Sequence, residues 1–309
     1  MNLKILNISS YIYNVFQIFY KKEFRGWGRK RSGKFALWCH ERFGGSLMLL
    51  EDGFIRSLGL GVDGSPSFSL VEDNVGIYYD ATAPSRLENT LNEYDFASDT
   101  KLMDEAREAI GLIQKHHISK YNNTPETSEE LFASQDERRV LIIAQTAGDA
   151  SLNYGMVDDY TTDDMIAAAT IENPHAKVYV KVHPDVLSGK KKSDIDIREL
   201  DERVQIITQN VNPISLLKHF EKVYTKTSGM GFEALLVGCE CVCFGMPFYA
   251  GWGVTDDRST CQRREAKRSV EEIFAAAYIL YTQYHNPYTN RPSDILDTIH
   301  GIIRQRGKL

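Results

Sequence analysis

The segment TKTSGMGFEALLVG, residues 225–238, has the residue types of an anion-binding helix start. Thr227 or Ser228 can cap a helix whose first turn holds glycines, and Gly229 lets a ligand approach the backbone. The free N–H groups and the dipole at such a start favour a negative charge. Glu233 follows on the next turn, where its carboxylate can accept hydrogen bonds from ribose hydroxyls. The segment predicts either a nucleotide-phosphate site or a capped, packed helix that binds nothing.

A second segment, YVKVHPDV, ends an apolar run on a histidine. Pro184 prevents a strand from simply continuing, so His183 is expected at a strand end. It can donate a hydrogen bond to a departing phosphate, and alternation places Lys181 on the same face. A single histidine is more often structural. The two segments together favour a phosphate site.

Carboxylates end two further apolar runs. LLEDGFIRSLGLG, residues 49–61, carries Glu51 and Asp52 before a glycine, and IIAQTAGD, residues 142–149, carries Gln145 and Asp149. Ligands of open α/β sheets collect outside the carboxyl ends of the strands. Each of these endings therefore supplies a group suited to a sugar or a phosphate.

Alternating strands and helices must position these endings. In the first half we expect a helix over 32–44, an apolar run over 46–50, the segment GIYYD at 76–80 and helical spacing over 85–121. In the second half we expect strands at 139–145, 177–184, 203–208, 222–227 and 240–245, with helices at 162–172, 214–220 and 232–238. Short β-rich runs separated by helices indicate parallel sheets with helical crossovers. The prediction is a two-domain α/β protein.

The domain boundary is predicted in an acidic, apolar-poor stretch, residues 122–137. We expect an N-terminal α/β domain at 1–125, a linker at 126–137 and a Rossmann-like domain at 138–262. Residues 263–309 are expected to form helices that pack back across the domains.

Composition is that of an ordinary globular protein, with 42% apolar and 25% charged residues among 309. A net charge of -6 gives no global attraction to nucleic acid or anionic lipid, so any anion site must be local. Cys239, Cys241 and Cys243 alternate, which puts them on one strand face and differs from a zinc knuckle. Buried, reduced thiols in a cytosolic protein are expected.

The N-terminal segment lacks the basic beginning and cleavage site of a signal peptide and is too short to span a bilayer. A cytoplasmic location follows. Ile12, Val15, Phe16 and Phe19 fall on one helical face. Basic residues follow closely at Lys21, Lys22, Arg25, Arg29, Lys30 and Arg31. Two arrangements are open: peripheral contact with an anionic inner-membrane surface, where a lipid-linked acceptor would wait, or a helix docked on the N-terminal domain.

These motifs resemble those of known enzymes. Glu-Asp-Gly at 51–53, His-Pro at 183–184 and Thr-Ser at 227–228 are similar to the motif set of bacterial sialyltransferases that use CMP-sugars on a GT-B fold. Longer strings resemble still more closely the capsule-synthesis β-Kdo transferases of the KpsC type, from about Gly26 to about Tyr284. These strings are LEDGFIRSLGLG, GIYYDATAPSRLE, VKVHPDVLSGKK, GFEALLVG and CFGMPFYAGWGVTDDR.

The resemblance implies two Rossmann-like domains facing a cleft, in the GT-B manner, and a retaining transfer of Kdo from CMP-β-Kdo without a metal or other cofactor. The acceptor would be a lipid-linked or other glycan. Asp149 matches the family nucleophile, Glu51 or Asp52 the acceptor-side acid/base, and the segments at 183–184 and 227–229 the CMP-binding positions. Nucleic acid is not an expected partner.

The chemistry requires these residue types. Retention by double displacement needs one carboxylate to attack the anomeric carbon and another group to move the acceptor proton. The charge on departing CMP must be met by fixed donors, here His183 and Ser228. Arg56 is the best placed partner for the Kdo carboxylate. The remaining predicted substrate contacts are Ser57, Gln145, Lys181, Thr227, Gly229 and Glu233. Tyr249 and Trp252 are expected either to stack on a sugar or base or to belong to a packing loop.

Two departures limit the resemblance. The family commonly has Asp-Gln-Thr where this chain has Ala144-Gln145-Thr146, so the role of that carboxylate is not carried over. Family enzymes often contain two modules and this chain has one, which predicts a single kind of linkage. Two other functions stay open. A non-catalytic CMP-sugar-binding or export-associated capsule protein would not need Asp149, and an inverting sialyltransferase would not share the GFIRSLGLG and GMPFYAGWG contexts.

Overall fold

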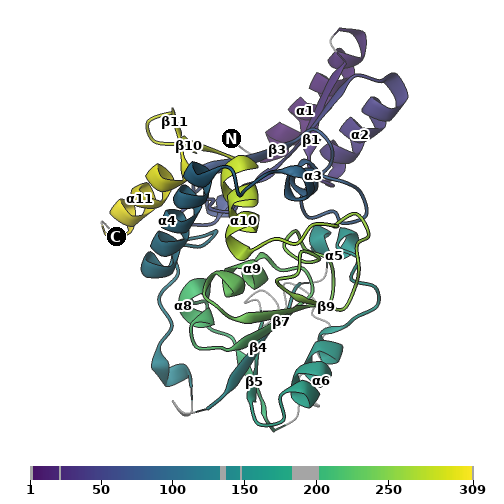
Figure 1. The fold of residues 1–309 in the computed structure, drawn as a ribbon. Coiled ribbons are helices and arrows are strands. Elements are labelled where there is room, and N and C mark those ends of the chain that lie inside the picture. Colours follow the sequence, from purple (N-terminus) through teal and green to yellow (C-terminus); the bar gives the residue numbers. More distant parts are fainter. Residues whose placement is uncertain (1–2, 21, 133–136, 147, 183–201, 308–309) are drawn as a thin grey trace.

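The computed structural model describes residues 3–20, 22–132, 137–146, 148–182 and 202–307. Figure 1 shows two sheet domains, with the N-terminal part above and the middle of the chain below. The final segment returns to the upper domain. The predicted α/β class with two sheet domains is confirmed.

The upper domain is built on a mixed sheet with the strand order β1-β2-β3-β10-β11, where the sequence pattern indicated a parallel one. Strands β1 and β2 are parallel and are joined by α2, while β3 runs antiparallel to β2. The N-terminal elements are α1 (Leu3–Phe19), β1 (Glu23–Trp27), α2 (Arg31–Phe43), β2 (Ser46–Asp52), a 3-10 turn (Gly61–Asp63), β3 (Ser69–Asp73), α3 (Arg86–Glu93) and α4 (Thr100–His116). Because β1 and β2 are parallel, their carboxyl ends meet at one edge of the sheet.

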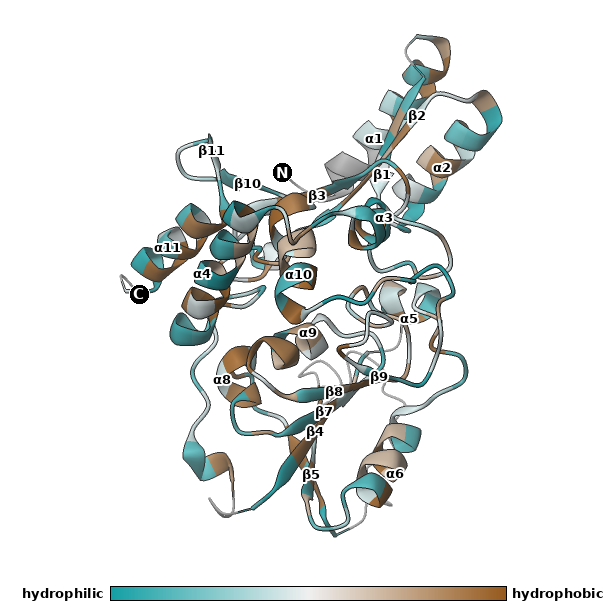
Figure 2. Cartoon of the chain, viewed as in Figure 1, coloured by the Kyte–Doolittle hydropathy of each residue, from teal (hydrophilic) through white to brown (hydrophobic). Residues whose placement is uncertain are grey.

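The lower domain is built on a parallel sheet with the order β6-β5-β4-β7-β8-β9. Its elements are a 3-10 turn (Glu129–Leu131), β4 (Arg139–Ile143), α5 (Ala150–Tyr154), α6 (Thr162–Glu172), β5 (Lys177–Lys181), β6 (Val204–Ile207), α8 (Pro213–Leu217), β7 (Lys222–Thr225), α9 (Gly229–Leu236), β8 (Glu240–Cys243) and β9 (Asp256–Asp257). Figure 2 shows the strongly apolar residues of α9 and of the strands in this domain. β4 is buried along its whole length, as expected for a central parallel strand.

The C-terminal segment differs from the expected set of helices. It contains α10 (Val270–Phe274), a π-helical turn (Ala275–Leu280), β10 (Thr282–Asn286), β11 (Arg291–Ser293) and α11 (Ile295–Arg306). β10 pairs antiparallel with β3, and β11 pairs with β10. The segment therefore completes the upper sheet, where β3 would otherwise present an unpaired edge.

GIYYD, residues 76–80, is a turn, and the strand in this region is β3. The buried carboxylate of Asp73 accepts the backbone N–H groups of Val75 and Gly76 at 2.8 and 2.9 Å and that of Arg86. These bonds fold the chain back after β3. The apolar residues at 76–80 therefore pack as a loop.

All five cysteines are free and buried, which confirms the prediction of reduced, buried thiols. Their arrangement differs from the expected single face. The sulfur atoms of Cys241 and Cys243 lie 3.9 Å apart on β8. Cys239 precedes the strand and contacts the carbonyl oxygens of Leu217 and Phe220 instead.

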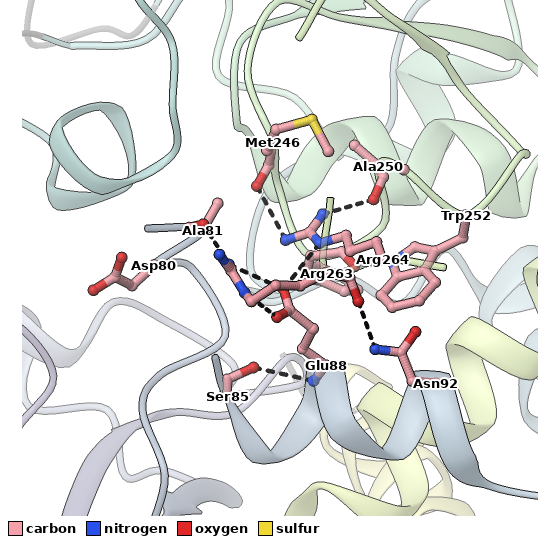
Figure 3. A network of polar contacts seen from close by, with 12 residues as sticks. Asp80, Ala81, Ser85, Glu88, Asn92, Met246, Ala250, Trp252, Arg263 and Arg264 are labelled. Carbon is pink, nitrogen blue, oxygen red and sulfur yellow. Dashed lines mark hydrogen bonds and ion pairs between the residues drawn. The ribbon is translucent and has the colours of Figure 1, made fainter. Parts of the chain in front are cut away.

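The two domains share one apolar cluster. Phe54, which follows β2, packs on Phe248 and Tyr278 with ring centroids 4.9 and 4.8 Å apart. Beside this cluster, Arg263 and Arg264 both reach Glu88 on α3, at 2.7 and 3.2 Å, as Figure 3 shows. Arg264 also donates to the carbonyl oxygens of Pro247 and Ala250. These contacts fix the strand endings of one domain relative to those of the other.

Candidate active site

The carboxylate of Glu51 lies at the carboxyl end of β2. Leu49 and Leu47, two and four residues earlier on the same face, are buried, so Glu51 continues an apolar face. Its Oε1 accepts hydrogen bonds from the indole Nε1 of Trp27 at 2.9 Å and from the backbone N–H of Asp52 at 3.1 Å. Burial raises the pKa of Glu51, and the charges of Lys30 and Lys120 partly offset this rise. A carboxyl group of this kind is suited to exchanging a proton.

Asp52 points to the other face and pairs with Arg56, whose Nε lies 2.9 Å from Oδ1. The same guanidinium donates to the Ser57 hydroxyl at 2.8 Å and to the Ser65 carbonyl at 3.2 Å. Only 13% of the Arg56 side chain is exposed, and Ser57 is fully buried. The expectation that Arg56 and Ser57 contact substrate fits this geometry poorly, because both side chains hold the loop after β2.

A polar cluster lies at the carboxyl ends of β4 and β7. The Gln145 amide accepts the backbone N–H of Thr227 at 2.8 Å and donates to the Thr227 hydroxyl at 3.1 Å. The Ser151 and Thr227 hydroxyls are 2.9 Å apart. Asp149 is exposed and accepts hydrogen bonds from the backbone N–H and the hydroxyl of Ser151, at 3.0 and 3.1 Å. The structure thus joins three predicted residues through Ser151, which the sequence did not single out.

Asp149 is also the N-cap of α5, as its bond to the Ser151 N–H shows. Capping is what an unreactive aspartate would do at this position. It is also compatible with a reactive one, because the cap uses Oδ1 and the side chain faces solvent.

Ser228 caps α9 by accepting the Met230 N–H at 3.2 Å, as the sequence predicted. The space beside Gly229 is open, since an added Cβ would meet nothing within 4 Å. The Tyr249 hydroxyl supports this helix start from inside by donating to the Ser228 carbonyl at 2.6 Å. The start of α9 is therefore capped, supported and accessible.

Tyr249 and Trp252 are 0% and 1% exposed, so neither ring offers a face for stacking on a sugar or base. The Trp252 indole donates to the Phe248 carbonyl at 2.9 Å. Of the two interpretations of PFYAGWG, the structure has the packing loop, because this segment forms part of the core between the domains.

Glu233 does not face the helix start. It is buried, and its Oε1 accepts the Ser119 hydroxyl at 2.5 Å from the other domain. Burial raises the pKa of Glu233 to about 7. The expected ribose contact is thus replaced by a contact between domains, because Glu233 lies on the inner side of α9.

Lys181 ends β5, and burial lowers the pKa of its ammonium group. Its Nζ donates to the Val182 carbonyl at 3.2 Å. His183 lies outside the described residues.

The end of β2 that carries Glu51 and Asp52, here called the acidic edge, faces the polar cluster across the domain boundary. The Ala81 N–H donates to the Tyr154 carbonyl at 2.8 Å, which ties α5 to the upper domain. Burial raises the pKa of the Tyr78 phenol, and the negative charges of Glu51, Asp52 and Asp149 add to this rise. Carboxylates about 100 residues apart in sequence therefore act on one partly buried phenol.

Trp27 and Ser151 contact the predicted catalytic groups and were missed from the sequence. Trp27 lies in the glycine- and base-rich segment 26–34, but nothing in its spacing links it to Glu51. Ser151 follows Asp149 by two residues, a spacing typical of N-caps, and that spacing could have identified it. Among the residues that the structure describes, no group of three or more His, Cys, Asp or Glu side chains could hold a metal ion.

Comparison with known proteins places this geometry in a family. Residues 25–288 match the family described as capsule polysaccharide biosynthesis protein. The chain belongs to this family. The capsule polysaccharide modification protein LipA of Neisseria meningitidis (serogroup A) is 46% identical over 84% of this chain. The chain spans only 38% of the length of that relative.

Two solved structures from Thermosulfurimonas dismutans resemble this member of the family. One is described as KpsC, beta Kdo 2,4 transferase, and is 41% identical to this chain with a TM-score of 0.86. The match covers 98% of this chain and 96% of the chain in that structure. The other, described as KpsC, beta Kdo 2,7 transferase, has a TM-score of 0.71 and 26% identity, with 99% and 97% covered. The family membership and the GT-B-type α/β fold expected from the motifs are thereby confirmed.

Proposed function

We propose that this protein is a retaining glycosyltransferase that moves Kdo from CMP-β-Kdo to a glycan or lipid-linked acceptor in capsule or surface polysaccharide synthesis. The observation that carries the proposal is the likeness, over nearly the full length of both chains, to a structure described as a beta Kdo 2,4 transferase. Lower identity to the 2,7 transferase favours a 2,4 linkage. The two candidate carboxylates, acting on one phenol from opposite domains, are consistent with a double displacement.

In the first step, a carboxylate oxygen of Asp149 attacks the anomeric carbon of Kdo. The bond from that carbon to the phosphate oxygen breaks, and CMP departs with the electron pair. Ser151 orients the Asp149 carboxylate, and the start of α9 at Ser228 and Gly229 receives the charge on CMP. His183 keeps its sequence-based role as a second phosphate donor.

In the second step, the acceptor hydroxyl attacks the same carbon from the opposite side, its proton passes to Glu51, and the bond to Asp149 breaks. Two inversions give retention. Glu51 suits this role better than Asp52, because Glu51 is desolvated while Asp52 is neutralised by Arg56. The N-terminal domain is thus assigned to the acceptor and the lower domain to the donor.

The test is release of CMP from CMP-Kdo and from CMP-sialic acid, each with an alkyl Kdo glycoside as acceptor. We expect CMP to be released from CMP-Kdo and not from CMP-sialic acid. NMR of the product should show a β linkage, and the same spectrum gives the linkage position. Release from CMP-sialic acid with inversion would identify the sialyltransferase alternative. Binding of both donors without turnover would identify the non-catalytic alternative.

The exposed face of α1 supports contact with a membrane surface. No helix in the described part of the chain is both long and apolar enough to cross a bilayer. Ile12, Phe16 and Phe19 are 60, 60 and 80% exposed. The opposite face is docked, since the Asn14 amide exchanges two 2.8 Å hydrogen bonds with the backbone of Arg25 at the edge of β1. Both arrangements expected for this segment are therefore compatible, and a cytoplasmic protein could rest on the inner membrane through this face.

Phe16→Ser/Phe19→Ser is the variant that tests this contact, because it leaves Asn14 in place. We expect it to reduce sedimentation with anionic liposomes by about 10-fold or more, from the apolar area lost. The matched control is Ile171→Ser, which removes a 78% exposed side chain from the lower domain. Equal sedimentation of both variants and the wild type would rule the contact out.

A further inference from the structure

Two lysines at the loop between β1 and α2 lack a carboxylate partner among the described residues. Lys30 is the N-cap of α2 and Lys34 lies in its first turn, and both are exposed. Two nearby arginines do have such a partner: Arg29 pairs with Asp80, and Arg56 pairs with Asp52. The two ammonium groups therefore place positive charge beside the acidic edge, close enough for Lys30 to lower the pKa of Glu51.

Each lysine stands over an aromatic ring that leads to one candidate catalytic carboxylate. The Lys30 Nζ is 5.4 Å from the centre of the Trp27 ring, and Trp27 donates to Glu51. The Lys34 Nζ is 5.8 Å from the centre of the Tyr154 ring. Tyr154 ends α5, the short helix that Asp149 caps, and lies about 7 Å along the helix axis from it. The two lysines thus lie near the domain boundary, Lys30 on the side of Glu51 and Lys34 on the side of Asp149.

The backbone that carries the lysines is closely packed. Gly28 has a φ of 36°, and a Cβ there would lie 2.2 Å from the Tyr79 hydroxyl and 3.0 Å from Glu51 Oε2. A Cβ at Gly33 would lie 1.8 Å from the Gly28 carbonyl. The Tyr79 hydroxyl also accepts the Arg29 N–H at 2.7 Å. The loop has little room to move, so the lysine stems start from fixed points close to Glu51.

The start of α2 adds to this positive field. Lys30 makes no side-chain capping bond, so no side chain of the N-cap residue neutralises the first-turn N–H groups. The dipole of a 13-residue helix favours a negative charge at this end. The candidate phosphate-binding start of α9 belongs to the other domain, which leaves this second basic region without a role in binding the donor.

We infer that Lys30 and Lys34 bind an anionic group of the acceptor, a carboxylate or a phosphate, and so hold the acceptor hydroxyl over Glu51. This inference rests on the proposed function and names the class of acceptor, an acidic glycan or a phospholipid. Charge-assisted hydrogen bonds to two ammonium groups fix an anion firmly, while the rings beneath limit where the lysine side chains lie.

The test compares Lys30→Ala/Lys34→Ala with the wild type on matched acceptors. The probes are an alkyl Kdo glycoside with a free carboxylate, its methyl ester, and an alkyl glycerophosphate. We expect kcat/KM for the carboxylate probe to fall by about 10- to 1000-fold, with less than about 3-fold change for the ester. Loss on the glycerophosphate probe alone would identify a lipid headgroup as the anion. Lys30→Arg/Lys34→Arg should keep most activity, and Lys101→Ala on α4 is the control for lost surface charge.

Binding without donor separates this inference from the proposed function. Calorimetric titration with the carboxylate probe should show binding by the wild type, at least 10-fold weaker binding by the double alanine variant, and unchanged CMP affinity. Equal losses on the carboxylate and ester probes, or no loss on any of the three probes, would overturn the lysine site. Lysine-dependent binding with no CMP release from any donor would overturn the proposed function and leave the site standing.

Discussion

The carboxylates of Glu51 and Asp149 both lie near the carboxyl end of a parallel strand, Glu51 in the last two residues of β2 and Asp149 in the loop after β4, yet their surroundings differ. Glu51 extends an apolar strand face and is held by the indole of Trp27, so its charged form is poorly solvated. Asp149 is exposed and is held by hydrogen bonds from Ser151. Burial suits a group that must gain and lose a proton. Exposure suits a group that must stay ionised and reach a bulky donor.

The largest effect is expected from Asp149→Asn. An amide keeps the capping bond to Ser151 but cannot attack the anomeric carbon, so kcat should fall by about 10³- to 10⁵-fold while CMP affinity stays the same. Initial-rate kinetics and calorimetric titration measure the two quantities. Near-normal turnover would reduce Asp149 to the capping role that the structure already shows.

Glu51→Gln should lower kcat/KM by about 10²- to 10⁴-fold, because the acceptor proton loses its receiving group. Since the pKa of Glu51 is raised, the wild type should lose activity as pH falls, at a pH above the usual range of glutamate, and the Gln variant should lack this limb. The matched control is Asp52→Asn, which affects a residue paired with Arg56. A larger loss in the control would reverse the assignment of the two carboxylates.

Glu233→Gln tests whether a third carboxylate, which is buried and contacts the other domain, is ionised at neutral pH. Its folded-state pKa of about 7 lies above 4.5, so its effect on stability is most favourable below pH 4.5 and is lost as pH rises through about 7. The neutral amide should therefore stabilise the protein at pH 8.5, by at most about 3 kcal/mol, and have little effect at pH 5. Urea unfolding at both pH values measures this difference. An effect that is the same at both would contradict the ionisation of Glu233.

Ser228→Ala is expected to have the smallest effect. It should weaken CMP binding by about 1–3 kcal/mol if the hydroxyl contacts the phosphate. Ser269→Ala on α10 removes an N-cap serine that is not part of the polar cluster and controls for lost helix stability. Calorimetric titration with CMP would show equal affinities in the two variants if Ser228 only caps α9.

Much of this site could be predicted from the sequence. The parallel strands β4, β5 and β7 appear as apolar β-rich runs, and their polar endings gave Gln145, Asp149 and Thr227. Those residues do meet in one cluster, because parallel strands bring their carboxyl ends to one edge. The cap at Ser228 was likewise predictable from local chemistry. These features depend on residues close in the chain or on one sheet.

Two features could not be predicted from local sequence because they depend on how the domains pack. These are the direction in which Glu233 points from α9 and the burial of the loop with Tyr249 and Trp252. Glu233 could face a ligand or Ser119, and only the docking of α9 on the upper domain selects Ser119. The rings of PFYAGWG have the composition of a sugar-binding surface, but Phe54 of the upper domain packs on Phe248, and Phe232 of α9 packs on Phe248 and Tyr249. β10 and β11 joined the first sheet because β3 needed a partner that the local pattern did not specify.

By itself, the sequence determined most strands and helices of the lower domain, which strand endings carry carboxylates, amides and hydroxyls, and which family motifs they match. The tertiary structure alone decided which of these groups are buried, paired or accessible: Glu51 is desolvated beneath Trp27, Arg56 is engaged by Asp52, and Asp149 is exposed beside Ser151. The physical reason is the separation along the chain over which each interaction acts. Strand and helix propensities and caps act between near neighbours in the chain, whereas desolvation and ion pairing depend on groups that only folding brings together.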